Sequence, residues 1–139
     1  MRRILLAMLF AAVAGAATAQ NARLSAAEVR AELYGVRLSG VLEGLNEPWQ
    51  ECIEPSGRTV FTFMRDVDEG RLSVDRAGRA CFAYAHDHFR RPACFVVMRD
   101  GSNYRFDTWV TRQVERGVRH CEAGGAFVQG GDALSQRGL

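Results

Sequence analysis

Short runs of apolar and β-branched residues with a period of two follow one another through most of the chain, and no other feature constrains the fold as strongly. Such alternation sends successive side chains to opposite faces of a strand. The runs cover residues 36–41, 49–53, 58–65, 71–75, 79–85, 93–99 and 103–110. Turn-forming residues lie between them at 54–57, 66–70, 75–78 and 99–102. We therefore expect a mainly β fold, a small antiparallel β-barrel or curled meander sheet of about seven or eight strands.

A short helix is predicted before the first strand. Ser25 is a typical N-cap, and Glu28 stands three residues later, at the spacing of a capping box. Val29 and Leu33 share one face of this helix, and Gly35 supplies the positive φ with which helices commonly end.

The strand at 58–65 has apolar side chains on both of its faces. Phe61 and Phe63 lie on one face, whereas Val60 and Met64 lie on the other. We expect this strand to be covered on both sides, with the predicted helix on its outer side.

The segment from 110 to 121 fits two patterns. Valines recur every four residues between Val110 and Val118, as on a helix. The β-branched content and Gly117 favour strands instead. We expect a final strand at residues 118–122.

The beginning of the chain has the features of a secretory signal peptide, which we place at residues 1–19. Arg2 and Arg3 precede an apolar stretch that is shorter than the ~20 residues of a membrane-spanning helix. Small residues at Ala17 and Ala19 predict cleavage before Gln20. We expect a periplasmic or secreted protein with no stable membrane insertion after cleavage, a single β-rich domain at 20–123 and a flexible glycine-rich tail at 124–139.

The charge balance argues against a nucleic-acid partner. Two of the 18 basic residues lie in the leader, so the rest of the chain carries 16 basic and 16 acidic residues. Binding to nucleic acid depends on summed positive potential, which a neutral domain lacks.

Four cysteines follow the leader, which predicts two disulfides in an oxidising compartment. Four cysteines allow three pairings. Cys81 and Cys94 flank a predicted hairpin, in which opposed strands bring Cα atoms within disulfide range. This favours a Cys81–Cys94 bond, which leaves Cys52 and Cys121 to join the two ends of the sheet.

Several of these segments together resemble a group of small secreted alphaproteobacterial proteins of uncharacterised function. The matching segments are residues 24–28, 35–40, 49–52, 55–57, 70–74, 81–82, 94–95 and 99–101, together with Tyr104. Cys52 departs from the pattern, because an aromatic residue is expected there, and Cys121 is a further departure. The resemblance implies a fold and a compartment, and it implies no catalytic residues.

The loop of the predicted hairpin contains His86, Asp87 and His88. In an extended segment both imidazoles point to the same side and offer two metal ligands. A structural zinc site needs four, and His120 is the remaining histidine. We therefore interpret the triplet first as an exposed loop tip, with metal binding or a small hydrolytic activity through His86 and His88 as the alternative.

We expect this protein to be a non-enzymatic binding module that needs no cofactor. No nucleophile is evident beside a histidine base. The partner would be another envelope protein or a small ligand, held by the loop at 85–92. Phe89 and Arg90 are the predicted anchors because aromatic residues and arginine dominate binding hot spots, and Arg91 lies beside them.

Overall fold

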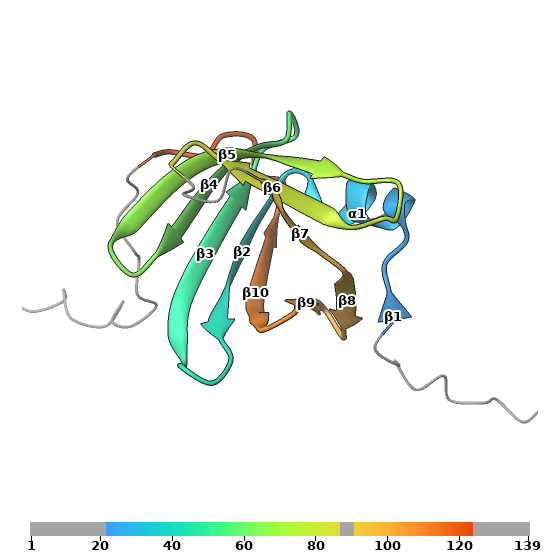
Figure 1. The fold of residues 1–139 in the computed structure, drawn as a ribbon, viewed down its shortest axis with the longest axis horizontal. Coiled ribbons are helices and arrows are strands. Elements are labelled where there is room, and N and C mark those ends of the chain that lie inside the picture. Colours follow the sequence, from blue (N-terminus) through green and yellow to red (C-terminus); the bar gives the residue numbers. More distant parts are fainter. Residues whose placement is uncertain (1–21, 87–90, 124–139) are drawn as a thin grey trace, which may run out of the picture.

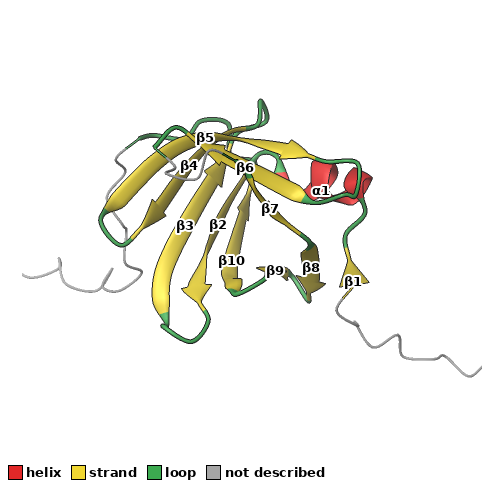
Figure 2. Ribbon diagram, in the orientation of Figure 1, coloured by secondary structure: helices red, strands yellow, loops and turns green. Residues whose placement is uncertain are grey.

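Ten strands form one antiparallel sheet that curls into a half-barrel in the computed structural model, which describes residues 22–86 and 91–123 (Figure 1). An eight-residue helix precedes the second strand (Figure 2). The elements have the following bounds: β1 Ala22–Arg23, α1 Ala26–Leu33, β2 Val36–Leu42, β3 Glu47–Ile53, β4 Arg58–Phe63, β5 Asp66–Val74, β6 Ala80–Tyr84, β7 Ala93–Phe95, β8 Val97–Asp100, β9 Asn103–Phe106 and β10 Trp109–Arg116.

Helix α1 begins where the capping pattern predicted. Ser25 Oγ accepts from the Glu28 backbone N–H at 3.2 Å, and the Glu28 carboxylate accepts from the Ser25 N–H at 2.7 Å. Val29 and Leu33 are fully buried and pack into the core. Gly35 has a φ of 72°, which allows the chain to turn from the helix into β2.

The sheet curls so far that a single stretch of chain passes from the strand at one edge to a strand near the opposite edge. The strand order is β1-β8-β9-β10-β2-β3-β4-β5-β6-β7. Strands β7 and β8 are separated in sequence by Val96 alone, yet β7 pairs with β6 and β8 pairs with β9. The run predicted at 93–99 is therefore divided between two strands that lie near opposite edges of the sheet.

Two glycines permit strands to approach closely within this curl. A Cβ atom at Gly40 would lie 1.9 Å from the backbone oxygen of Val110 on β10. A Cβ atom at Gly70 would lie 2.4 Å from the backbone oxygen of Ala83 on β6. Both distances are shorter than any real Cβ contact, so only glycine fits at these two positions.

The half-barrel has two different ends. Because successive hairpins of an antiparallel meander alternate between ends, the turns at 43–46, 64–65 and 107–108 and the loop after Tyr84 share one end, which we call the mouth. Helix α1 precedes β2 at the opposite end. The core there contains Leu24, Val29, Leu33, Val36, Ile53, Leu72, Ala80, Val97 and Tyr104, with exposures of 3% or less.

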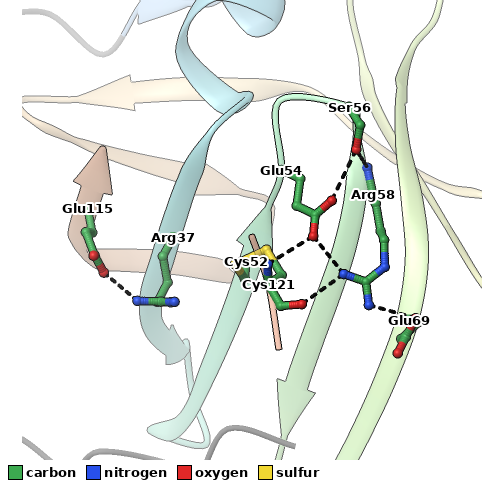
Figure 3. The surroundings of a disulfide bond; sticks show 8 residues. All are labelled: Arg37, Cys52, Glu54, Ser56, Arg58, Glu69, Glu115 and Cys121. Carbon is green, nitrogen blue, oxygen red and sulfur yellow. Dashed lines mark hydrogen bonds and ion pairs between the residues drawn. A yellow bond between two sulfur atoms is a disulfide. The ribbon is translucent and has the colours of Figure 1, made fainter. Parts of the chain in front are cut away.

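Both predicted disulfides are present. Cys81–Cys94 joins directly paired residues of β6 and β7, and Cys52–Cys121 joins β3 to the segment after β10. Figure 3 shows how polar groups fix this last segment beside its disulfide. The Glu54 carboxylate accepts from the Cys121 N–H at 3.0 Å, and Arg58 Nη1 donates to Glu54 at 2.8 Å and to the Cys121 carbonyl at 2.9 Å.

The end of the chain differs from the prediction. The last strand is β10, which runs to Arg116 and pairs with β2, and residues 118–122 form no strand. Gly117 ends the strand with a φ of 79°. The segment then crosses the outer face, where Val118 is buried with Val60 and the Cys52–Cys121 bond. The predicted cover on the outer side of β4 therefore exists, but it comes from this segment and not from the helix.

Two other boundaries also differ from the prediction. Residues 66–70 belong to β5, and the turn before that strand lies at 64–65. The run predicted at 103–110 is broken by a turn at 107–108, because Asp107 adopts a φ of 57°. With the divided run at 93–99 and the two-residue β1, these breaks explain why ten strands replace the predicted seven or eight.

The predicted signal peptide and the glycine-rich tail lie outside the described residues. Among residues 22–86 and 91–123, no helix is long and apolar enough to cross a membrane. The two disulfides are bonds of a kind that persists in oxidising compartments.

Candidate functional site

A cavity of about 250 Å³ lies inside the curl of the sheet. A volume of this size admits a molecule on the order of ten non-hydrogen atoms. Most of its walls come from the halves of the strands that lead to the mouth, whereas α1 contributes nothing. The lining residues are Leu38, Trp49, Glu51, Phe61, Phe82, Tyr84, Ala93, Phe95, Phe106 and Trp109.

The wall of the cavity is largely aromatic. Trp109 meets Trp49 and Phe61 edge to face, with ring centroids 6.0 and 5.7 Å apart. Phe61 lies 5.5 Å from Tyr84, which stacks on Phe82 at 6.1 Å. These are favourable separations for aromatic pairs, so the rings support one another and leave their remaining surface to the cavity.

Glu51 is the one carboxyl group among the lining residues. It lies between Trp49 and Ile53 in the alternation of β3, so its side chain points to the inside of the sheet and is only 3% exposed. The Tyr84 hydroxyl donates to Glu51 Oε2 at 2.5 Å. The other oxygen, Oε1, is buried and has no hydrogen-bond partner among the described residues.

Burial raises the pKa of Glu51 to about 8. The cause is desolvation, which disfavours the charged form of a carboxyl group. The Tyr84 hydrogen bond and the nearby Thr59 hydroxyl act in the opposite direction but are weaker. At neutral pH most molecules therefore hold a proton on Glu51.

Two further polar side-chain atoms are buried without a hydrogen bond to any described residue. They are Trp49 Nε1, which is a donor, and Thr59 Oγ1. Thr59 is near enough to influence the Glu51 carboxyl, but no hydrogen bond of normal geometry joins the two side chains. A buried polar atom without a partner costs about 1–3 kcal/mol, and such atoms are rare in native proteins.

The mouth carries apolar side chains that face solvent. Leu45 and Met64, in the turns between β2 and β3 and between β4 and β5, are 65% and 60% exposed. Met64 has a φ of 55°, a conformation that is uncommon for a side chain of this size. Backbone strain of this kind is concentrated at functional sites in proteins.

The predicted binding loop is attached to the same end of the half-barrel as the cavity. Arg91 is exposed, whereas Phe89 and Arg90 lie outside the described residues. Loop and cavity are continuous along the chain, because Tyr84 precedes the loop and Ala93 follows it, and both residues line the cavity.

Of the two histidines predicted as metal ligands, His86 is described and His88 is not. The His86 side chain is 80% exposed, and its Nδ1 lies 3.2 Å from Asp68 Oδ1. His120 is in the segment that follows β10, at the opposite end of the half-barrel, so His86 and His120 do not share a site.

Within the described part of the chain, one group of side chains has metal-ligand spacing, and it consists of Asp75, Cys81 and Cys94. The two sulfur atoms are bonded to each other, so neither is a thiolate that could bind a metal.

The cavity was not predicted from the sequence. Its aromatic residues fit an ordinary strand pattern, and the predicted site was a loop. One signal was present, however, because Glu51 is a charged residue at the inward-facing position of a strand between Trp49 and Ile53. Lone carboxyl groups are rarely fully buried, so such a position indicates a possible site.

Comparisons of the chain with protein-family models, curated proteins and solved structures found no match.

Proposed function

We propose that this protein is a non-enzymatic binder of a small, largely apolar molecule, which it holds in the aromatic cavity. The observation that carries the proposal is a cavity with aromatic walls, together with a few buried polar atoms that have no hydrogen-bond partner in the described part of the chain. Small-molecule sites commonly combine an apolar lining with a few placed polar groups. Of the two partners expected from the sequence, the cavity favours the small ligand over an envelope protein.

The composition of the lining supports binding rather than catalysis. The cavity is lined by no histidine, cysteine or serine among the described residues, so a nucleophile with its base is not part of the wall. The predicted signal peptide and the two disulfides support a periplasmic or secreted location.

Filling the cavity should abolish binding. Ala93 lines the cavity, and an Ala93→Phe variant would place a ring in the space that the ligand needs. Ala83 is exposed on the outer face of β6 and provides a matched Ala83→Phe control. The probe is 2-phenylethanol, a neutral molecule of suitable size, and its binding is followed by tryptophan fluorescence.

Fluorescence reports directly on this site because both tryptophans of the chain, Trp49 and Trp109, line the cavity. We expect saturable binding by the native protein and by Ala83→Phe, and loss of binding by Ala93→Phe. Equal binding by both variants would place the binding site elsewhere and contradict the proposal.

A further inference from the structure

The cavity combines a buried carboxyl group with a wall of aromatic rings. We propose that its ligand is a small organic cation, a protonated amine with an apolar body, whose ammonium group donates to Glu51 Oε1 while its body lies against the rings of Trp49, Phe61 and Trp109. This inference rests on the small-ligand function proposed above and names the class of the ligand.

The first argument is that Glu51 has no counter-charge among the residues that the structure describes. Carboxylates elsewhere in the described chain pair with arginines, as in Glu43 with Arg105 at 2.6 Å and Glu115 with Arg37 at 2.7 Å. The carboxylates in those pairs are largely exposed to solvent, so they need a cationic partner less than a buried carboxylate does. Glu51 is almost completely buried, and no ion pair joins it to any described residue.

A buried carboxylate is unfavourable unless a cation and hydrogen bonds compensate it. Tyr84 supplies one hydrogen bond to Oε2, and Oε1 remains open. A ligand with an N–H-bearing cation would supply the missing charge and the missing donor at the same atom.

The second argument is the electrostatic character of the wall. The faces of aromatic rings carry partial negative charge and attract cations, and tryptophan does so most strongly. Seven aromatic side chains line the cavity, and within residues 22–86 and 91–123 no arginine or histidine lines it. Every charged or π-electron group of the wall therefore favours a cation and disfavours an anion.

The proton on Glu51 gives the proposal a distinctive consequence. Because burial raises the pKa of this carboxyl to about 8, a cation that binds at neutral pH must displace the carboxyl proton. The balanced step is the release of one proton to the buffer, which leaves an ammonium–carboxylate pair in the cavity. As the pH increases, the affinity for the cation should therefore increase about tenfold per pH unit up to pH 7 and become constant above pH 8.

The experiment compares three probes of similar shape that differ in charge. They are 2-phenylethylammonium, the neutral 2-phenylethanol and the anionic phenylacetate. The amine stays protonated up to about pH 9, because its pKa is close to that of lysine. Tryptophan fluorescence gives the affinities from pH 6 to pH 9, and calorimetry in buffers of different ionisation enthalpy counts the protons released.

We expect the amine to bind at least tenfold more tightly than the alcohol at pH 8, and phenylacetate to bind most weakly. Binding of the amine at pH 7 should release close to one proton, whereas binding of the alcohol should release none. A Glu51→Gln variant should bind the amine no better than the alcohol and should lose the pH dependence.

Two controls separate the role of charge from damage to the cavity. The Glu51→Gln variant should keep the native tryptophan emission spectrum in the absence of ligand, which shows that the cavity persists, because both tryptophans line it. A Glu115→Gln variant removes an exposed carboxyl on β10 and should leave all three affinities unchanged.

The possible failures can be told apart. If the alcohol binds as tightly as the amine, or if the amine releases no proton, the cation inference is overturned and the small-ligand function stands. If none of the three probes changes the fluorescence at millimolar concentration, both proposals are overturned.

Discussion

Glu51 shows how one buried residue links the stability of this protein to pH. Its pKa in the folded protein is about 8, whereas the ordinary value for a glutamate is 4.5. The folded state therefore keeps a proton that the unfolded chain has already lost. The resulting stabilisation is complete below about pH 4.5 and is lost as the pH rises through 8.

We predict that a Glu51→Gln variant loses this dependence, because an amide does not ionise. The stability of the variant relative to the native protein should increase between pH 5 and pH 8, by on the order of 3–4 kcal/mol. Urea unfolding at pH 5, 6.5, 8 and 9 measures the difference. Parallel stability curves would show that Glu51 titrates normally.

At the scale of single residues, the sequence was informative where the chemistry is local. Ser25 and Glu28 cap the helix as predicted because a capping box involves atoms only three residues apart. The environment of Glu51 depends on Tyr84, which lies 33 residues away in sequence, so the spacing of residues could not reveal it.

Helix α1 is held against the sheet by a polar cluster around Tyr104. The Tyr104 hydroxyl donates to Glu32 Oε2 at 2.7 Å and accepts from Arg116 Nη2 at 2.7 Å. Arg99 also pairs with Glu32, and Arg116 Nη1 donates to the Glu32 carbonyl at 3.1 Å. One phenol thus connects the helix to β9 and β10.

We predict that Tyr104→Phe destabilises the protein by about 1–2 kcal/mol, because Glu32 and Arg116 both lose a partner. Tyr34→Phe is a suitable comparison, since the Tyr34 hydroxyl makes a single 3.3 Å bond to the Leu72 carbonyl. Its loss should be about 0.5–1 kcal/mol. Thermal or urea unfolding of both variants tests this order, and an equal loss would argue against the bridging role of Tyr104.

Element boundaries were predictable only where the period of two is undisturbed. The extent of strand β10 beyond Val110 was not predicted, because its pairing with β2 shifts in register between Thr111 and Gln113. On its other side β10 is also irregular, since the Thr111 hydroxyl accepts from the Tyr104 N–H of β9 at 2.7 Å. A side-chain acceptor of this kind leaves no mark on the hydrophobic pattern.

The two disulfides stabilise different parts of the whole molecule. Cys52–Cys121 closes a separation of 69 residues and lies on the outer face, away from the cavity. Cys81–Cys94 closes 13 residues and joins β6 to β7, both of which line the cavity. The loop-entropy model assigns about 4 kcal/mol to the long loop and about 3 kcal/mol to the short one.

We predict that removal of the Cys52–Cys121 bond has the larger effect on stability, whereas removal of the Cys81–Cys94 bond has the larger effect on ligand affinity. The double variant Cys52→Ala, Cys121→Ala should lose more stability but keep its affinity for 2-phenylethanol. The variant Cys81→Ala, Cys94→Ala should lose less stability but bind more weakly, because β7 is paired only with β6. Urea unfolding and fluorescence titration of folded protein measure the two quantities, and equal affinities would show that the wall needs no covalent support.

At this largest scale the sequence predicted the fold class and both disulfides, because alternation, turns and paired cysteines all indicated a curled meander. The cavity was beyond such reasoning. A meander with the same pattern can fill its interior with side chains, and here the difference depends on how seven rings and one carboxyl group pack against one another.

The shortness of the outermost strands has a consequence for behaviour in crowded solution. A sheet that is not fully closed exposes unpaired N–H and C=O groups along its margins, and these can recruit strands from other molecules. The outermost strands as described here are β1, with two residues, and β7, with three. Margins this short offer little template for intermolecular pairing, so the half-barrel can keep its interior accessible to a ligand with little tendency toward fibrous aggregation.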